Sequence, residues 1–388
     1  MQNLTFLSQI ALLIVVAPIF ARTFKISVAV IEIILGTLVV WAGFIEADNE
    51  IFKTIAKIGF FYLMFLAGLE INIKKFVSFK DKFIKNVLLY FGCLYGISFL
   101  LYFVLGLNPV YIVAIPIVSL GMIMALINEH GKTHKWLELS LIIGVIGELI
   151  SISALVIFDA IVAHGISMEF YKNIGILILI LAVSFYLFRA LRLLLWWFPE
   201  LRKIIMPEID NMSQDIRVSM ALFFILIAVM QYLGIDMVLG AFIAGVFIAN
   251  FFAHKVELPH TLHTVGFGFL VPLFFIYVGT TLDLKVLFTK EIVTTAGLIV
   301  LAMVSARLIS SLVAYYKYLG FRDTVLFSFG DSMPLTFLIA IATIAVNNNA
   351  ISLNEYYAFV LAAMIEVVFI MILIQFIMAK IKPKPTKS

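Results

Sequence analysis

The sequence predicts an all-α polytopic membrane protein, with about thirteen transmembrane helices in two inverted six-helix repeats that contain crossed, broken helices. Composition is the first reason: 64% of the 388 residues are hydrophobic and 13% are charged, whereas soluble domains are nearer half apolar and a quarter charged. The apolar residues also form runs near the roughly 20 residues that cross a bilayer. Finally, short motifs of the first half recur in the second half. We therefore expect residues 1–388 to form a single transmembrane unit.

The apolar runs give the expected spans in order. They cover approximately residues 4–21, 26–44, 55–71, 87–105, 109–127, 139–163, 174–197, 217–233, 237–252, 266–282, 292–316, 324–346 and 355–378. No Lys or Arg precedes the first run, and further runs follow at once, so we interpret it as a retained helix and not as a cleaved signal.

The basic residues between the spans predict the orientation. With the N-terminus outside, nineteen Lys and Arg residues fall in cytoplasmic segments and five in outer segments. Cytoplasmic loops of membrane proteins carry such an excess. We therefore expect an external N-terminus, a short basic cytoplasmic tail at 380–388, and a location in a bacterial inner membrane.

Several classes of protein are disfavoured by what the sequence contains. Cys93 is the single cysteine and lies in an apolar run, which argues against a disulfide or a thiolate metal cluster. The net charge of +4 comes from lysines between spans and does not indicate a nucleic-acid partner. No nucleophile constellation or phosphate-binding loop favours an enzyme, and we expect no cofactor.

Two pairs of motifs indicate the inverted repeat. The segment FLAGLEINIKKF at 65–76 resembles FFIYVGTTLDLKVLF at 274–288, so that Gly68 matches Gly279, and one span earlier Leu35-Gly36 matches Leu239-Gly240. The copies lie seven spans apart, an odd number, and therefore face opposite sides of the membrane. Inverted repeats are typical of secondary transporters. We assign the first repeat to 1–163, a linker helix to 164–216 and the second repeat to 217–379.

The fifth and twelfth spans are repeat partners, and both contain helix-breaking residues. Pro116 and Gly121 lie inside the first, and Gly330 and Pro334 inside the second. Proline removes a backbone donor, and freed backbone groups at membrane depth survive only inside protein or along a cavity. Paired breaks in the two halves therefore predict a binding site near the middle of the membrane.

Three charged side chains lie deep in apolar spans. Glu148 is in the sixth span, Glu366 in its repeat partner, the thirteenth, and Arg307 in the eleventh. A buried carboxylate costs a few kcal/mol even on lenient insertion scales, so each of the two glutamates needs a proton, a cation or a charged partner. Arg307 does not deprotonate and should pair with a carboxylate. Both Glu148 and Glu366 are candidates, and we favour Glu366 as a structural ion pair.

The segments FLAGLEIN, LGAFIAGVFIA and GFLVPLFFIYVGTTLDL resemble the cation:proton antiporter superfamily, above all its Kef-type and Nap-type bacterial members. The resemblance covers the whole transmembrane unit. It implies the fold of the NhaA and NapA antiporters, with a six-helix core domain that moves against a dimerisation domain, and hence a homodimer. Kef-type members carry a cytoplasmic nucleotide-binding domain that the sequence does not display, so glutathione gating would need a separate regulatory subunit.

The resemblance also implies the site residues. The family's ion-binding acid in the sixth span corresponds to Glu148, and Gly147 replaces the polar residue that usually precedes it. The basic residue of the eleventh span corresponds to Arg307. The break of the fifth span falls near Ser119, and the break of the twelfth at Gly330-Asp331-Ser332. Asp331 either binds the ion or caps the half-helix that follows.

Burial disfavours the charged form of a carboxylate, so Glu148 is expected to hold a proton near neutral pH and to release it towards an alkaline side. The same carboxylate suits Na⁺ or K⁺, with the hydroxyls of Ser119, Ser151 and Ser332 completing the shell. Competition of one proton with one cation for Glu148 predicts electroneutral exchange by alternating access.

Two other functions remain open from the sequence. One is a sodium-coupled organic-anion symporter of the same fold, which would call for more polar side chains around the breaks. The other is a non-transporting membrane sensor or subunit derived from an antiporter, which the unusual Gly147 and the segment GDSMPLTF allow.

Overall fold

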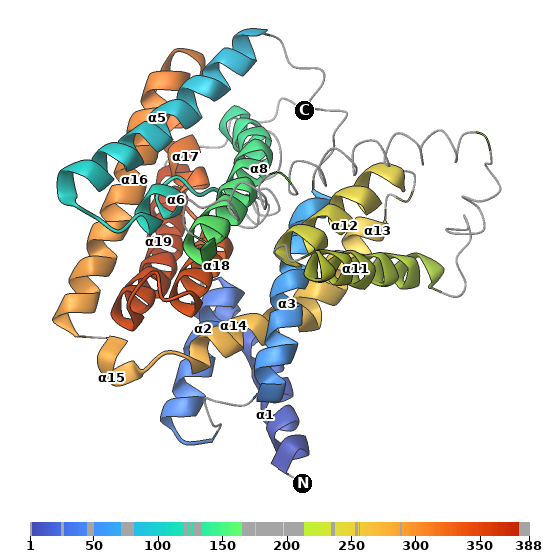
Figure 1. The fold of residues 1–388 in the computed structure, drawn as a ribbon. Coiled ribbons are helices and arrows are strands. Elements are labelled where there is room, and N and C mark those ends of the chain that lie inside the picture. Colours follow the sequence, from blue (N-terminus) through green and yellow to red (C-terminus); the bar gives the residue numbers. More distant parts are fainter. Residues whose placement is uncertain are drawn as a thin grey trace, which may run out of the picture. The chain divides into compact units, whose positions relative to one another are not determined.

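The structure, a computed structural model, describes residues 2–24, 27–44, 50–70, 81–119, 123, 126, 134–164, 175, 197, 213–233, 237–252, 255, 257–287 and 289–379. Within these ranges the secondary structure is helical and includes no strand. The chain divides into two compact units. Unit 1 comprises Met1–Ser78 and Asp159–Leu284, and unit 2 comprises Phe79–Phe158 and Lys285–Ser388. Each unit thus combines helices from both halves of the sequence (Figure 1).

The helices of unit 1 are α1 (Gln2–Phe24), α2 (Val28–Trp41), α3 (Glu50–Leu69), α11 (Gln214–Tyr232), α12 (Met237–Phe251), α13 (Leu258–Val265), the π-helical turn η1 (Gly266–Leu270) and α14 (Val271–Thr280). Those of unit 2 are α5 (Asp81–Leu105), α6 (Val110–Ala114), most of α8 (Lys135–His164), α16 (Lys290–Leu319), α17 (Phe321–Asp331), α18 (Leu335–Asn347) and α19 (Leu353–Ala379). The short α15 (Leu284–Leu287) lies where the two units join in sequence.

The helices have the lengths that a membrane protein requires. In the described part, six are long and apolar enough to cross a bilayer: Glu50–Leu69, Phe83–Leu105, Gln214–Tyr232, Leu258–Thr280, Lys290–Leu319 and Leu353–Met378. Shorter apolar helices occupy Ser8–Phe24, Val28–Trp41, Met237–Phe251 and Phe337–Asn347. The expected span 174–197 lies outside the described residues except for its two ends, so the count of thirteen stays a prediction.

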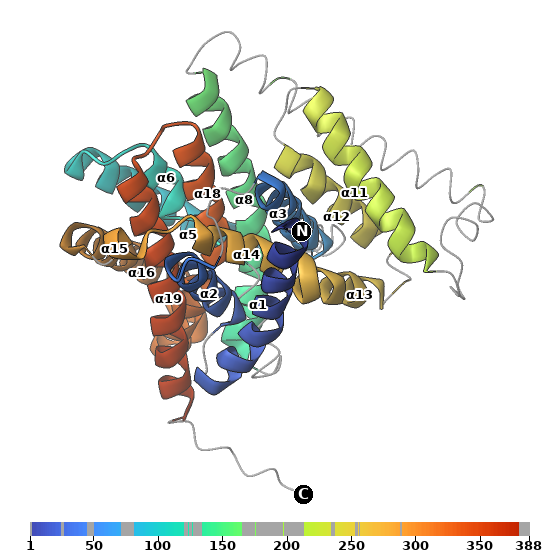
Figure 2. The ribbon, with the colours of Figure 1, turned by 90° about the horizontal axis from the view of Figure 1, so that it is seen from below.

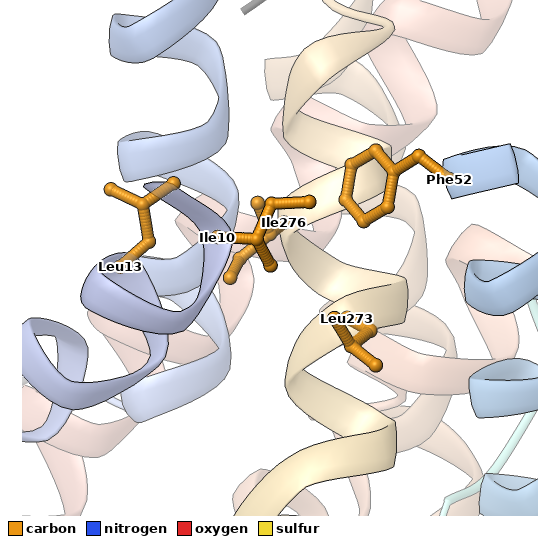
Figure 3. Packing of buried hydrophobic residues seen from close by; sticks show 5 residues of the cluster. All are labelled: Ile10, Leu13, Phe52, Leu273 and Ile276. Atoms are coloured by element: carbon orange, nitrogen blue, oxygen red, sulfur yellow. The ribbon is translucent and has the colours of Figure 1, made fainter. Parts of the chain in front are cut away.

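A small apolar cluster joins three helices of unit 1. Ile10 and Leu13 of α1, Phe52 of α3, and Leu273 and Ile276 of α14 are all buried and pack together (Figure 3). The ring of Phe52 also meets the ring of Tyr277 edge to face, with centroids 5.4 Å apart. These side chains come from positions more than two hundred residues apart in sequence, so the cluster connects the first half of the chain to the second.

Glycines allow two helix pairs of unit 1 to approach until their backbones touch. A Cβ atom on Gly36 of α2 would lie 2.2 Å from the carbonyl oxygen of Ile276 in α14, and one on Gly279 would lie 2.1 Å from the carbonyl oxygen of Ile33. Any side chain at either position would collide with backbone. The hydroxyl of Thr37 adds a hydrogen bond of 3.0 Å to the carbonyl oxygen of Gly279.

The pair α3 and α12 repeats this geometry. A Cβ atom on Gly68 would lie 2.2 Å from the carbonyl oxygen of Phe242, and one on Gly245 would lie 2.0 Å from that of Phe65. The second helix of each repeat therefore packs on the third helix of the other, as two inverted copies require. In this geometry Gly245 is the counterpart of Gly36, which corrects the match with Gly240 expected from the sequence.

The long helix α16 of unit 2 packs against α5, α17 and α19. Its partner α19 also packs against α18, and α6 lies against both α5 and α18 (Figures 1 and 2). These helices, together with α8, correspond to the last three expected spans of each repeat. All four buried charged side chains of the described part of unit 2 occur here: Glu148, Arg307, Asp331 and Glu366.

Candidate ion-binding site

Both predicted helix breaks are present in unit 2. In the first, α6 ends at Ala114 and the chain continues through Pro116 without regular helix as far as Ser119. In the second, α17 ends at Asp331 and α18 begins at Leu335, so Ser332–Pro334 form the gap. Gly121 lies outside the described residues. The prolines remove helical hydrogen bonds at both places, which leaves carbonyl oxygens available to other donors.

Arg307 binds carbonyl oxygens at both breaks. Its Nε donates to the carbonyl oxygen of Asp331 at 3.0 Å, and one Nη donates to the carbonyl oxygen of Ile117. The other Nη donates to the carbonyl oxygen of Met303, one turn earlier in α16, at 3.0 Å. The side chain is completely buried. A guanidinium group suits this place because its planar fork reaches several acceptors and stays charged.

Glu148 lies near the middle of α8, 13 residues after Lys135 and 16 before His164. Its exposed fraction is 2%. One turn further along α8, the hydroxyl oxygen of Ser151 accepts a hydrogen bond of 3.0 Å from the backbone N–H of Val118. The first break is thereby attached to the helix that carries Glu148. The predicted ligands Ser119 and Ser151 are both buried in this region.

Gly147 allows α8 to lie directly against the first break. A Cβ atom there would be 2.8 Å from Cβ of Val118 and 3.0–3.1 Å from its two γ-carbons. The absence of a polar side chain before Glu148 is therefore a packing requirement of this chain. Gly330, at the second break, faces α8 in a looser way, since its Cβ would lie 3.2 Å from the hydroxyl oxygen of Ser140.

Asp331 is the second carboxylate at the breaks. Its Oδ2 accepts a hydrogen bond of 3.1 Å from the hydroxyl of Tyr90 in α5, and no described residue bonds its Oδ1. It does not cap α18, because the residue before that helix is Pro334 and no side chain caps it. Ser332 is fully buried, and its hydroxyl has no hydrogen-bond partner within the described ranges.

Glu366 is fully buried in α19. Arg307 acts on it electrostatically, yet neither carboxylate oxygen of Glu366 has a hydrogen-bond partner in the described part of the chain. The guanidinium nitrogens instead bond the three carbonyl oxygens described above. The structural ion pair between Arg307 and Glu366 stays a prediction.

The sequence did not single out Tyr90 or Val118. A tyrosine in an apolar span is common and carries no signal by itself. Tyr90 matters because its ring packs in a buried aromatic group with Tyr315 and Phe327 while its hydroxyl donates a hydrogen bond to Asp331. Val118 matters through its backbone N–H and its volume, neither of which a sequence pattern displays.

The chemistry of the donors fits a hard cation or a proton. Among the described residues, no group of three or more His, Cys, Asp or Glu side chains could hold a metal ion together. Carboxylate, hydroxyl and carbonyl oxygens are hard donors, and oxygen ligands of this kind suit hard cations.

Comparison with known proteins agrees with this chemistry. Residues 10–380 match the family model described as sodium/hydrogen exchanger, transmembrane. The putative Na⁺/H⁺ antiporter YjbQ of Bacillus subtilis is 29% identical over 398 residues, covering 94% of this chain and 62% of the relative. The probable Na⁺/H⁺ antiporter 3 of Methanocaldococcus jannaschii is 26% identical over 321 residues, covering 80% of this chain and 79% of the relative. The chain thus spans less than two thirds of the length of YjbQ.

The fold has a counterpart among solved structures. The sodium proton antiporter MjNhaP1 from Methanocaldococcus jannaschii superimposes with a TM-score of 0.67, covering 97% of each chain at 14% identity. At that identity the likeness concerns the fold alone. Since the family model covers nearly the whole sequence, the chain belongs to the sodium/hydrogen exchanger family, whose members are membrane transporters and not enzymes.

Proposed function

We propose that this protein exchanges a monovalent cation, Na⁺ or K⁺, for protons by alternating access, with Glu148 as the residue that binds either one. The observation that carries the proposal is the position of Glu148. It is a buried carboxylate in the middle of α8, and Ser151, one turn away, binds the first of two helix breaks. A carboxylate at this depth favours a bound proton or a bound cation over the bare charge.

The two ligands compete for one charge. When the site faces an alkaline side, Glu148 loses its proton and attracts a cation; facing an acidic side, it takes a proton and releases the cation. The buried hydroxyls of Ser119, Ser151 and Ser332 and the carboxylate of Asp331 are the further groups that we assign to the site. Exchange at one carboxylate carries one positive charge in each direction, so we expect it to be electroneutral.

Arg307 supports the site without carrying a proton. It bonds carbonyl oxygens of both breaks and supplies a fixed positive charge that acts on the buried side chains of Asp331 and Glu366. Unit 2 contains the six spans that the resemblance assigns to a moving core, and unit 1 contains the others. We therefore assign unit 2 to transport and unit 1 to a dimerisation role. We place the N-terminus outside and the C-terminus in the cytoplasm, following the distribution of lysines.

The test is proton flux in proteoliposomes loaded with a pH-sensitive dye. Addition of Na⁺, K⁺ or Li⁺ to separate samples, with a cation-free control, identifies the cation. Glu148→Gln should abolish the cation-dependent signal while the protein stays folded. Glu138→Gln is the matched control, because Glu138 is exposed on the same helix; exchange by Glu148→Gln at the wild-type rate would overturn the assignment. A rate that follows an imposed membrane voltage would contradict electroneutral exchange.

A further inference from the structure

Glu366 occupies the centre of a spanning helix. It lies 13 residues from each end of α19 (Leu353–Ala379), which places it roughly 20 Å from both ends at 1.5 Å per residue. The side chain is fully buried. Because the side chain is buried, neighbouring protein groups decide its charge.

Among the described helices that pack on α19, one positively charged side chain, Arg307, acts on this carboxylate. These helices are α16, α17, α18 and, through the contact of the Tyr111 ring with the ring of Phe359, α6. The first contributes Arg307, which acts on Glu366 electrostatically. The second ends at Asp331, another acid, whose Oδ2 is bonded by Tyr90. The third, LTFLIAIATIAVN, contains no ionisable side chain. Glu355, in the first turn of α19, lies more than ten residues before Glu366.

Arg307 does not provide a hydrogen bond to Glu366. Each of its three nitrogens donates to a backbone carbonyl oxygen, at Asp331, Met303 and Ile117. Both oxygens of Glu366 are left without a hydrogen-bond partner among the described residues. An ionised carboxylate needs such bonds far more than a neutral carboxylic acid does, because removing a bare charge from water is much more costly than removing a neutral polar group.

We propose, in place of the ion pair with Arg307 expected from the sequence, that Glu366 is a second proton-binding site of unit 2, which keeps its proton while Arg307 bonds the carbonyl oxygens of the two breaks. The proton is resident, whereas the one on Glu148 is exchanged. Loss of this proton would create an anion that competes for the guanidinium and draws it away from Ile117 and Asp331. The inference rests on the proposed function only in naming Glu148 as the exchanging residue.

The experiment is infrared spectroscopy of the full chain reconstituted in lipid at neutral pH. A buried protonated carboxyl group gives a separate C=O band that shifts when H₂O is replaced by D₂O. We expect Glu366→Gln to remove the intensity of one carboxyl group from this region. Glu355→Gln, in the same helix, should leave it unchanged, because that side chain is at the helix end, where it accepts hydrogen bonds from Ser352. Glu366→Asp should move the band without removing it.

Two outcomes would overturn the proposal. One is a spectrum in which neither Glu366→Gln nor Glu366→Asp alters the protonated carboxyl region, which would mean that Glu366 is ionised. The other is loss of the Glu366 band on addition of Na⁺ or K⁺, which would mean that this residue holds the cation. Failure of the proposed function is seen separately, as exchange by Glu148→Gln, and does not depend on the infrared band.

Discussion

Val118 donates its backbone N–H to the hydroxyl oxygen of Ser151 across 3.0 Å. This bond ties the non-helical segment of the fifth span to α8, one turn from Glu148. It explains how a broken helix, which has lost internal hydrogen bonds, keeps a defined position beside a buried carboxylate. A further attachment of the same segment is the bond from Arg307 to the carbonyl oxygen of Ile117.

Ser151→Ala should weaken this junction. The substitution leaves the buried N–H of Val118 without its partner, which costs about 1–3 kcal/mol, and it removes a proposed ligand of the cation. We expect a lower unfolding temperature in detergent and a higher KM for the cation. Ser153→Ala is the control, because Ser153 is exposed and bonds within its own helix, to Leu149. Equal effects of the two substitutions would contradict a specific role for the bond.

Gly147→Ala should disturb the same contact from the other side. The added methyl would lie 2.8 Å from Cβ of Val118, and overpacking of this kind typically costs about 1–3 kcal/mol. Exchange activity and thermal stability should both fall. Combining Gly147→Ala with Val118→Gly removes Cβ and both γ-carbons of Val118 and should restore part of the loss. If the double variant loses at least as much stability as the two single variants together, the contact is not the cause.

Arg307→Lys should destabilise unit 2 although the charge is kept. Lysine presents a compact ammonium and cannot reproduce a fork that reaches three carbonyl oxygens. Each hydrogen bond to a charged group contributes about 1.5–3 kcal/mol, so the loss of two should lower the unfolding temperature markedly and reduce exchange. Arg322→Lys, at an exposed position in the first turn of α17, should change neither quantity. Wild-type stability of Arg307→Lys would contradict the bridging role.

Tyr90→Phe tests whether Asp331 belongs to the site. The change removes the hydrogen bond to Oδ2 of a carboxylate that is 1% exposed, at a cost of about 1–3 kcal/mol. We expect a change of several-fold in the KM for the cation. Tyr315→Phe is closely matched, since Tyr315 is buried in the same aromatic group but its hydroxyl has no partner among the described residues. If both variants behave like the wild type, Asp331 acts without Tyr90.

Gly279→Ala tests the packing of unit 1. Its Cβ would lie 2.1 Å from the carbonyl oxygen of Ile33, which is backbone and cannot rotate aside. We expect low expression or a clear loss of stability. Overpacking typically costs about 1–3 kcal/mol. Gly297→Ala, in α16, has open space around its Cβ and should be neutral or slightly stabilising. A stable Gly279→Ala variant would mean that α2 and α14 can separate at little cost.

Sequence patterns located the breaks well because proline acts on the backbone of its own helix. Pro116 with Gly121 and Gly330 with Pro334 predicted the two interruptions, and α17 ends at Asp331, one residue after Gly330. The register of the repeat was harder. Leu35-Gly36 and Leu239-Gly240 are similar in sequence, yet the contacts make Gly245 the structural counterpart of Gly36: Gly36 packs on α14 as Gly245 packs on α3. Close approach depends on which side of a helix faces its neighbour.

By itself, the sequence determined that this chain is a helical membrane protein with an inverted repeat, two broken helices and deep charges at Glu148, Arg307 and Glu366. Hydrophobic length, proline and charge act locally, so they can be read along the chain. The tertiary structure alone decided what those charges touch. Arg307 bonds the carbonyl oxygens of Ile117 and Asp331, and Tyr90 reaches Asp331. Backbone oxygens are present at every residue, and only folding selects those that lie at a helix break next to a buried guanidinium.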